Sequence, residues 1–457
     1  MRKLILIVID GMTPAMLEHG MATGIAPTLS RLAAAGRYET ALSVFPSLTP
    51  VCLASIATGA YPDVHRIPHL AWYQREKQRL VEYGSSFAAA RRSGPLRWLR
   101  DTTYAMNCEH LGHEAVTLFE ALEDRGFRAA AVNTTCFRGR TLHQPTVPGV
   151  TRAVRGPSHF FYYNLFSSHA TGAPFAIRRR SEGSIDDYAE AVGRWLVTRD
   201  AFDFLLYYLS DFDYASHSLG PLATENALTR SDRSIAAIVE AAGGIDEFLD
   251  RYAVIVCSDH GQTDVSRTIS LERSLGELPL AGRRSAPYPG VIVTASNRAA
   301  MVYTLPGCPL EVRELALRLD REPAAEVVCF REGGEAVARR EGAELRFTPS
   351  GSGWHTSGDP RVLDQPRALE RIWRALANPS AGELLVSARP GFEFADIAGR
   401  SHSGGSHGSL ERGDSEVPML TVGIERAVSS ITEIAPVVLE YFGLEPTIYR
   451  RTSAVAA

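Results

Sequence analysis

The sequence contains few cysteines and carries almost no net charge. Six cysteines are scattered through 457 residues. No two of them form a C-x-x-C pair, so neither a disulfide framework nor a cysteine-based metal site is indicated. The formal net charge of −4 gives no sign of the basic face that nucleic-acid binding favours. We therefore expect reduced thiols and no nucleic-acid partner.

Long hydrophobic runs are also absent. No stretch reaches the roughly 18 consecutive apolar residues of a membrane-spanning helix, so no membrane span is predicted. The apolar run at 4–9 is shorter than the hydrophobic region of a typical signal peptide, and it ends at Asp10. These absences favour a cytoplasmic protein. Nothing in the sequence indicates its oligomeric state.

Apolar runs alternate with amphipathic segments along most of the chain. The runs at 4–10, 202–211 and 252–257 are nearly continuous, as in strands buried on both faces of a parallel sheet. The segments 186–199 and 431–444 have the apolar spacing of helices. This alternation predicts an α/β fold, with a mostly parallel central β-sheet and helices on both faces.

Two stretches interrupt the alternation. Residues 264–400 are rich in Gly, Pro, Arg and Glu and contain only short strand-like pieces. A second, irregular insertion is expected at about 66–112. We therefore expect a core formed by 1–263 and 401–457, with 264–400 inserted as a cap subdomain.

Aspartate directly follows three of the predicted strands. Asp10 follows the first, Asp211 and Asp213 follow the second, and Asp259 follows the third. In open α/β sheets, ligands bind outside the carboxyl ends of the strands. Several carboxylates in one crevice repel each other, so this arrangement predicts a bound cation.

Histidines accompany these aspartates. His217 lies four residues after Asp213, on the same face of a helical turn, and His260 is adjacent to Asp259. A Gly/Ser-rich segment at 401–410 adds two more histidines. Carboxylate and neutral imidazole together suit zinc or manganese, and this mixture of nitrogen and oxygen ligands favours zinc.

The segment 44–62 has two interpretations. Thr49 precedes Pro50 and an apolar run that ends at Gly59, which is typical of an N-cap followed by proline at the first helical position. The same place also suits chemistry, since a helix N-terminus favours negative charge and donates N–H groups to phosphate. The residue pattern alone leaves both interpretations open.

Five motifs occur together in a familiar order. They are VIDGM, FPSLTPVCLASIATGAYPDVHRI, DFDYASHSLGP, SDHGQTDV and SHGSL, spread over residues 5–410. Their order and spacing resemble the alkaline phosphatase superfamily, and most closely its nucleotide pyrophosphatase/phosphodiesterase (type I phosphodiesterase) branch. The resemblance implies an alkaline-phosphatase-like core. It also implies metal-dependent hydrolysis of phosphodiester or nucleotide pyrophosphate bonds in small-molecule substrates.

The resemblance further implies two divalent metal ions, most consistent with zinc, with manganese as the alternative. One ion would be bound by Asp10, Thr49, Asp259 and His260, and the other by Asp213, His217 and His407. Asp213 is preferred to Asp211 because a histidine follows it four residues later, and His407 to His402 because a glycine follows it. Thr49 would be the nucleophile of a two-step in-line transfer through a covalent phosphothreonine.

One departure from the family pattern lies in YPDVHRIPHLAWY, residues 61–73. In this segment, family diesterases usually have the pattern YP…HG. An asparagine shortly after it helps to hold a phosphoryl oxygen. Here Arg66 stands where glycine is usual, and no asparagine follows nearby. The nearest polar substitutes, Arg66 and His69, are therefore the candidate substrate-binding residues.

Other functions fit the same motifs. A phosphomonoesterase or phosphonate hydrolase uses a similar core, and a monoester calls for an extra cation near the metals, for which Arg138 and Arg140 are candidates. The non-enzymatic alternative is a metal-bound nucleotide-sensing or structural protein with a degenerate site. Loss of a ligand would favour it, yet every ligand position is filled. Specificity is expected to reside in the cap and in 66–112.

Overall fold

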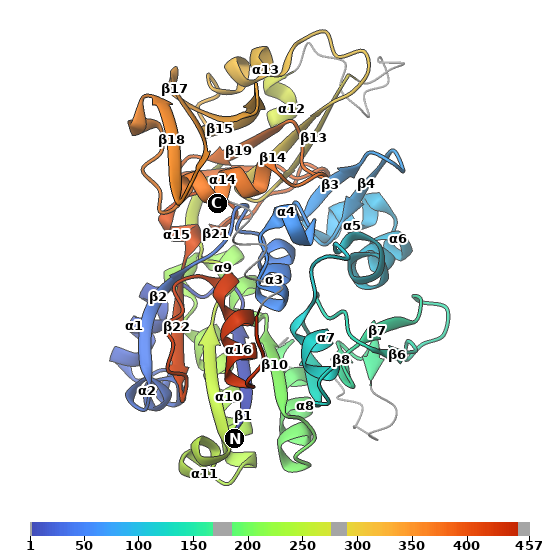
Figure 1. Ribbon diagram of the computed structural model, residues 1–457, viewed down its shortest axis with the longest axis vertical. Coiled ribbons are helices and arrows are strands. Elements are labelled where there is room, and N and C mark those ends of the chain that lie inside the picture. Colours follow the sequence, from blue (N-terminus) through green and yellow to red (C-terminus); the bar gives the residue numbers. More distant parts are fainter. Residues whose placement is uncertain (1, 168–184, 276–289, 447–457) are drawn as a thin grey trace.

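The computed structural model describes residues 2–167, 185–275 and 290–446, and its core is an eight-stranded sheet in the order β2-β22-β11-β1-β10-β5-β8-β9 (Figure 1). Its strands are β1 (Lys3–Ile9), β2 (Arg37–Leu42), β5 (Ala129–Val132), β8 (His159–Tyr162), β9 (Phe166–Ser167), β10 (Phe204–Leu209), β11 (Tyr252–Cys257) and β22 (Glu416–Val422). The run β11-β1-β10-β5-β8 is parallel, and antiparallel strands close both edges. The predicted mostly parallel sheet is confirmed.

The register of the central strands aligns their carboxyl ends. Ile9 of β1 pairs with Leu209 of β10, and Val8 pairs with Cys257 of β11. The segments that follow these three strands therefore start at one edge of the sheet, which is where ligands bind in open α/β sheets.

Helices cover both faces of this sheet, as predicted. Along β1, Leu4, Leu6 and Val8 face one layer, and the alternate side chains face the other. The first layer contains α3 (Thr49–Thr58), α7 (Leu118–Glu123) and α16 (Ile434–Tyr441). The second contains α1 (Pro14–Thr23), α2 (Pro27–Ala34), α8 (Asp186–Thr198), α10 (Glu225–Ala241) and α11 (Ile245–Arg251). No helix among the described residues is long and apolar enough to cross a membrane.

The segment 66–112, expected to be an irregular insertion, contains regular secondary structure. It contains a hairpin and three helical pieces: β3 (Ala71–Gln74), β4 (Arg79–Glu82), α5 (Phe87–Ser93), α6 (Pro95–Arg100) and the π-helix η1 (Asp101–His110). Its strands are too short to show an apolar period, and a π-helix lacks the 3.6-residue repeat of an α-helix. An ion pair joins β4 to the π-helix, with Arg79 Nη1 2.6 Å from Asp101 Oδ2.

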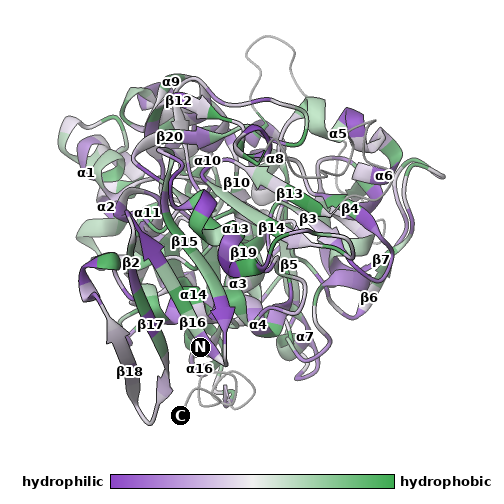
Figure 2. Ribbon diagram, turned by 90° about the horizontal axis from the view of Figure 1, so that it is seen from above, coloured by the Kyte–Doolittle hydropathy of each residue, from purple (hydrophilic) through white to green (hydrophobic). Residues whose placement is uncertain are grey.

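A second sheet has seven antiparallel strands in the order β13-β14-β19-β15-β16-β17-β18. They are β13 (Val291–Ser296), β14 (Ala299–Thr304), β15 (Ala325–Glu332), β16 (Glu335–Arg340), β17 (Ala343–Ser350), β18 (Gly353–Gly358) and β19 (Leu384–Ala388). Helix α13 (Val312–Leu319) packs on one face and α14 (Ala368–Leu376) on the other. Figure 2 shows apolar β15 within the molecule and the exposed strand β18 projecting at its margin.

This second sheet lies beyond the carboxyl ends of the core strands (Figure 1). A small sheet of β12 (Thr263–Ile269), β20 (Gly391–Phe394) and β21 (Gly405–Ser406) joins the two where the chain leaves the core and returns. We therefore propose that 264–400 is an inserted cap on a core of 1–263 and 401–457.

A buried ion pair attaches the second sheet to the core. Arg298, between β13 and β14, places Nη1 2.6 Å from Oδ1 of Asp414, and both side chains are fully buried. Asp414 belongs to α15 (Arg412–Ser415) and also accepts hydrogen bonds from the hydroxyls of Thr263 and Ser409. One carboxylate thus connects three separate segments of the chain.

Replacing Arg298 tests this connection. Arg298→Ala should lower the free energy of unfolding by about 3–5 kcal/mol, because it leaves the Asp414 carboxylate buried without its cation. The matched control is Arg412→Ala, which removes the exposed pair to Glu416 (2.7 Å) and should cost at most about 1 kcal/mol. Thermal unfolding midpoints measure both, and equal small shifts would contradict the role given to Arg298.

Candidate metal centre

The predicted site residues gather at the carboxyl edge of the core sheet. Asp10 follows β1, Asp259 and His260 follow β11, and Thr49 is the first residue of α3. Three of these residues are at most 4% exposed. Segments more than 200 residues apart in the sequence therefore meet at one place, as the aligned strand ends require.

Three oxygen atoms surround the Nε2 atom of His260. Thr49 Oγ1 is 3.1 Å away, Asp10 Oδ1 is 3.2 Å away and Asp259 Oδ2 is 3.6 Å away. One ring nitrogen offers at most one hydrogen atom to these three oxygens, and the buried Asp10 Oδ1 and Asp259 Oδ2 accept no hydrogen bond. Leaving such atoms buried and unpaired is costly. A divalent cation is the kind of group that these atoms bind together.

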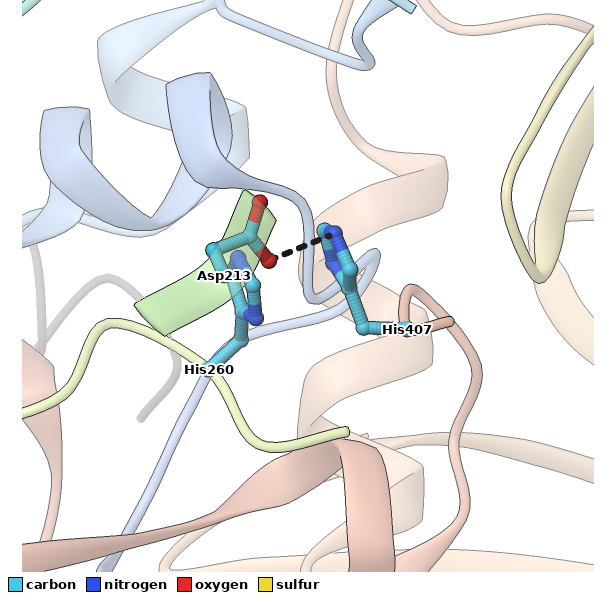
Figure 3. Close-up of side chains that lie close together, drawn as sticks. All are labelled: Asp213, His260 and His407. Atoms are coloured by element: carbon cyan, nitrogen blue, oxygen red, sulfur yellow. Dashed lines mark ion pairs between the residues drawn. The ribbon is translucent and has the colours of Figure 1, made fainter. Parts of the chain in front are cut away.

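The second predicted set lies directly beside the first. Asp213 and His217 belong to α9 (Asp211–Leu219), with Asp213 Oδ2 3.3 Å from His217 Nε2. Asp213 Oδ1 is 3.8 Å from Nε2 of His407, which follows β21 (Figure 3). The ring of His260 stacks on that of His407, with centroids 3.6 Å apart. Ligand atoms of Asp213, His260 and His407 all lie within 4.8 Å of one another, so His260 stands between the two sets.

Three imidazoles present the same nitrogen to this centre. His217 Nδ1 lies 2.9 Å from Gly405 O, His260 Nδ1 3.0 Å from Gly261 O, and His407 Nδ1 2.8 Å from Ser47 O. A carbonyl oxygen only accepts, so each Nδ1 carries a hydrogen, and in its neutral form each ring has its lone pair on Nε2. This arrangement is typical of metal-binding histidines.

The charges of the centre are unbalanced without a cation. Burial, together with repulsion by Asp259, raises the pKa of Asp10 well above its usual value. Burial also raises the pKa of Asp259, to about 7. Burial lowers the pKa of His217, but the neighbouring Asp213 carboxylate outweighs burial and brings it to about 9. Burial keeps the pKa of His407 well below its usual value. Carboxylates that ionise reluctantly beside imidazoles fit a site that a divalent cation completes.

Two neighbouring residues that the sequence analysis did not identify hold the ligands in place. Gln262 Nε2 donates to Asp213 Oδ1, and Tyr208 Oη donates to Asp10 Oδ2. Gly11, at φ +68°, leaves room for the contact of Gln262 with Asp213, since a Cβ at Gly11 would lie 2.8 Å from Gln262 Nε2. Gln262 follows His260 by two residues in DHGQ, which is the one sequence signal that pointed to it.

The N-cap prediction for Thr49 was wrong by one position. Leu48 is the N-cap residue of α3, and Thr49 is the first helical residue, with Pro50 next. No side chain caps this helix. The Thr49 hydroxyl is therefore free of a capping role and points toward His260, as the 3.1 Å distance shows.

The structure does not bring the two candidate substrate-binding residues into this cluster. Arg66 is exposed at the end of α4 (Pro62–His65) and has φ +65°, a conformation that glycine adopts readily. Its aliphatic carbons lie beside Gly112. His69 is buried, with Nδ1 3.0 Å from Ala71 O. Among the described residues, neither forms a hydrogen bond or ion pair with the predicted ligands.

The two arginines considered as extra cations for a monoester form ion pairs away from the metal centre. Arg138 pairs with Glu120 and donates to the carbonyl groups of the 111–115 segment. Arg140 pairs with Glu120 and Asp124. Both line a separate cavity of about 510 Å³ rather than the metal centre. The structure therefore removes the argument for a monoesterase that rested on these two arginines.

Comparison with known proteins bears on the identity of this chain. A family model for type I phosphodiesterase / nucleotide pyrophosphatase matches residues 4–410. Similar solved structures include phosphonoacetate hydrolase from Sinorhizobium meliloti 1021 in complex with phosphonoformate and with phosphonoacetate. The two comparisons have a TM-score of 0.60, identities of 19% and 18%, and cover 100% of this chain and 96% of the other. No match was found among curated protein sequences. Such low identities show a shared fold, and the family match shows more: this chain belongs to the type I phosphodiesterase / nucleotide pyrophosphatase family, hydrolases with an alkaline-phosphatase-like fold.

Proposed function

We propose that this protein hydrolyses phosphodiester or nucleotide pyrophosphate bonds of small molecules, with two divalent metal ions and Thr49 as nucleophile. One observation carries the proposal. The Thr49 hydroxyl lies 3.1 Å from His260 Nε2, which also has buried, unpaired oxygens of Asp10 and Asp259 within 3.6 Å. A hydroxyl placed among metal-ligand atoms at the start of a helix is well positioned for nucleophilic attack on phosphorus.

The residues present fit two ions. Asp10, Thr49, Asp259 and His260 would hold one, and Asp213, His217 and His407 would hold the other. Imidazole nitrogens together with carboxylates favour zinc, with manganese as the alternative. When bound, such ions lower the pKa of a coordinated hydroxyl and shield the charge on phosphoryl oxygens.

The reaction follows from the position of Thr49. Its hydroxyl loses its proton as Oγ attacks phosphorus, the bond from phosphorus to the leaving oxygen breaks, and that oxygen takes up a proton. Water then attacks the phosphothreonine, the bond between Thr49 Oγ and phosphorus breaks, and the threonine hydroxyl is restored. Thr49 is the first residue of α3, whose amino end favours the negative charge that develops during both steps.

Substitution of Thr49 tests the nucleophile. Thr49→Ala should lower kcat for bis-p-nitrophenyl phosphate by about 10³-fold or more, because no other hydroxyl replaces the attacking group. Its metal content, measured by elemental analysis, should stay at two ions, because six other ligands remain.

Thr49→Ser is the matched control. It should keep substantial activity, and acid-quenched samples should contain phosphoserine detectable by mass spectrometry. Activity close to wild type in Thr49→Ala would contradict the assignment. The same assay with p-nitrophenyl phosphate and with a phosphonate distinguishes a diesterase from the two alternative hydrolases.

Metal binding should depend on pH in a defined direction. With a pKa of about 9, the His217 ring carries a second proton, and so a positive charge, at neutral pH in the metal-free protein. Only the neutral ring binds metal. Zinc binding must therefore expel this proton. Apparent affinity should rise by about tenfold per pH unit on account of this proton and level off above its pKa. Chelator competition between about pH 6 and pH 8 measures the slope, and an affinity independent of pH would contradict this account.

A further inference from the structure

A residue of the second sheet reaches into the metal centre. Asn297 lies in the turn between β13 and β14, has φ +56° and is only 4% exposed. Its Nδ2 atom is 2.7 Å from His407 Nε2, the nitrogen proposed to bind metal. Ser296 donates its hydroxyl hydrogen to Asn297 Oδ1 at 3.1 Å, so the amide nitrogen is the atom that faces the centre.

The turn that carries Asn297 is held on the His407 loop by backbone contacts. The N–H of Arg298 donates to His407 O at 2.7 Å, and the N–H of Phe394 donates to Asn297 O at 2.9 Å. The buried pair of Arg298 with Asp414 fixes the same turn to the core. The backbone of Asn297 is therefore fixed beside the centre.

Asn297 also lines a small polar cavity beside the ligands. The cavity holds about 20 Å³, and Ser86, Arg400 and His402 are among its other lining residues. The ring of His402 stacks on that of His217, with centroids 3.7 Å apart. The cavity is thus adjacent to a proposed metal ligand, and polar groups converge on it.

We propose that Asn297 is a substrate-contacting residue whose amide N–H donates to a non-bridging oxygen of the phosphoryl group. This inference rests on the proposed function. A metal ion on His407 Nε2 takes the place of Asn297 Nδ2, which now lies 2.7 Å from that nitrogen, so the amide must turn aside about its side-chain bonds. The N–H then needs another acceptor, and a phosphoryl oxygen at the centre is the one that the reaction brings. A neutral donor suits the single negative charge of a diester, whereas the dianion of a monoester favours a cation.

Two substitutions separate this role from a structural one. Asn297→Gly removes the amide but keeps a residue that readily adopts positive φ. Asn297→Asp keeps the shape and also tolerates the left-handed region, but it replaces the donor with a charged acceptor. Metal content, the thermal midpoint and the dissociation constant of orthovanadate, measured by calorimetry on the metal-loaded protein, are the readouts.

Asn297→Gly should keep both metal ions and weaken orthovanadate binding by about tenfold to a hundredfold, as expected for one hydrogen bond to a charged group. Asn297→Asp should weaken it further, and kcat/KM for the diester should fall in parallel. The matched control is Asn133→Gly. Asn133 is also a buried asparagine at positive φ (+60°), and its Oδ1 accepts from the Tyr163 N–H. This control should bind orthovanadate as the wild type does.

Two results would overturn the inference while leaving the proposed function in place. The first is unchanged orthovanadate affinity in Asn297→Gly. The second is loss of a metal ion from that variant, which would make Asn297 a positioning residue for the metal. A wild-type protein that neither binds orthovanadate nor hydrolyses the diester would instead overturn the proposed function, and this inference with it.

Discussion

The structure depends on three carboxylates that share one buried edge of a parallel sheet. Asp10, Asp213 and Asp259 are each at most 7% exposed, and burial with mutual repulsion raises the pKa of two of them. Such a cluster is unfavourable by itself and becomes favourable around cations. The unpaired oxygens of Asp10 and Asp259, and the Nε2 atoms of three imidazoles, all face the place where those cations would bind.

The rest of the fold keeps these ligands in position. The sheet register aligns the strand ends that carry the aspartates, and backbone carbonyls fix the orientation of each imidazole. The second sheet contributes as well, because the buried pair of Arg298 with Asp414 anchors it beside His407. Through Asn297 it also places a hydrogen-bond donor 2.7 Å from His407 Nε2.

The sequence predicted the parts of this site that depend on local pattern. Buried strands followed by aspartate, and histidines at short spacing, indicated a cation site, and the family resemblance then implied the full ligand set, including Thr49 and His407. The contributions of Asn297 and Tyr208 could not be predicted, because each acts across a tertiary contact between distant segments. For the same reason Arg66 and His69, which were chosen as the nearest polar substitutes for the missing family asparagine, lie outside the cluster. The regular structure of 66–112 was missed because its elements are short and include a π-helix.

The most direct test of the central claim is a crystal structure of the zinc-loaded protein with anomalous diffraction data at the zinc edge. The account predicts two zinc peaks, one among Asp10, Thr49, Asp259 and His260, and the other among Asp213, His217 and His407. A single peak, or zinc bound elsewhere while these side chains remain unliganded, would contradict it.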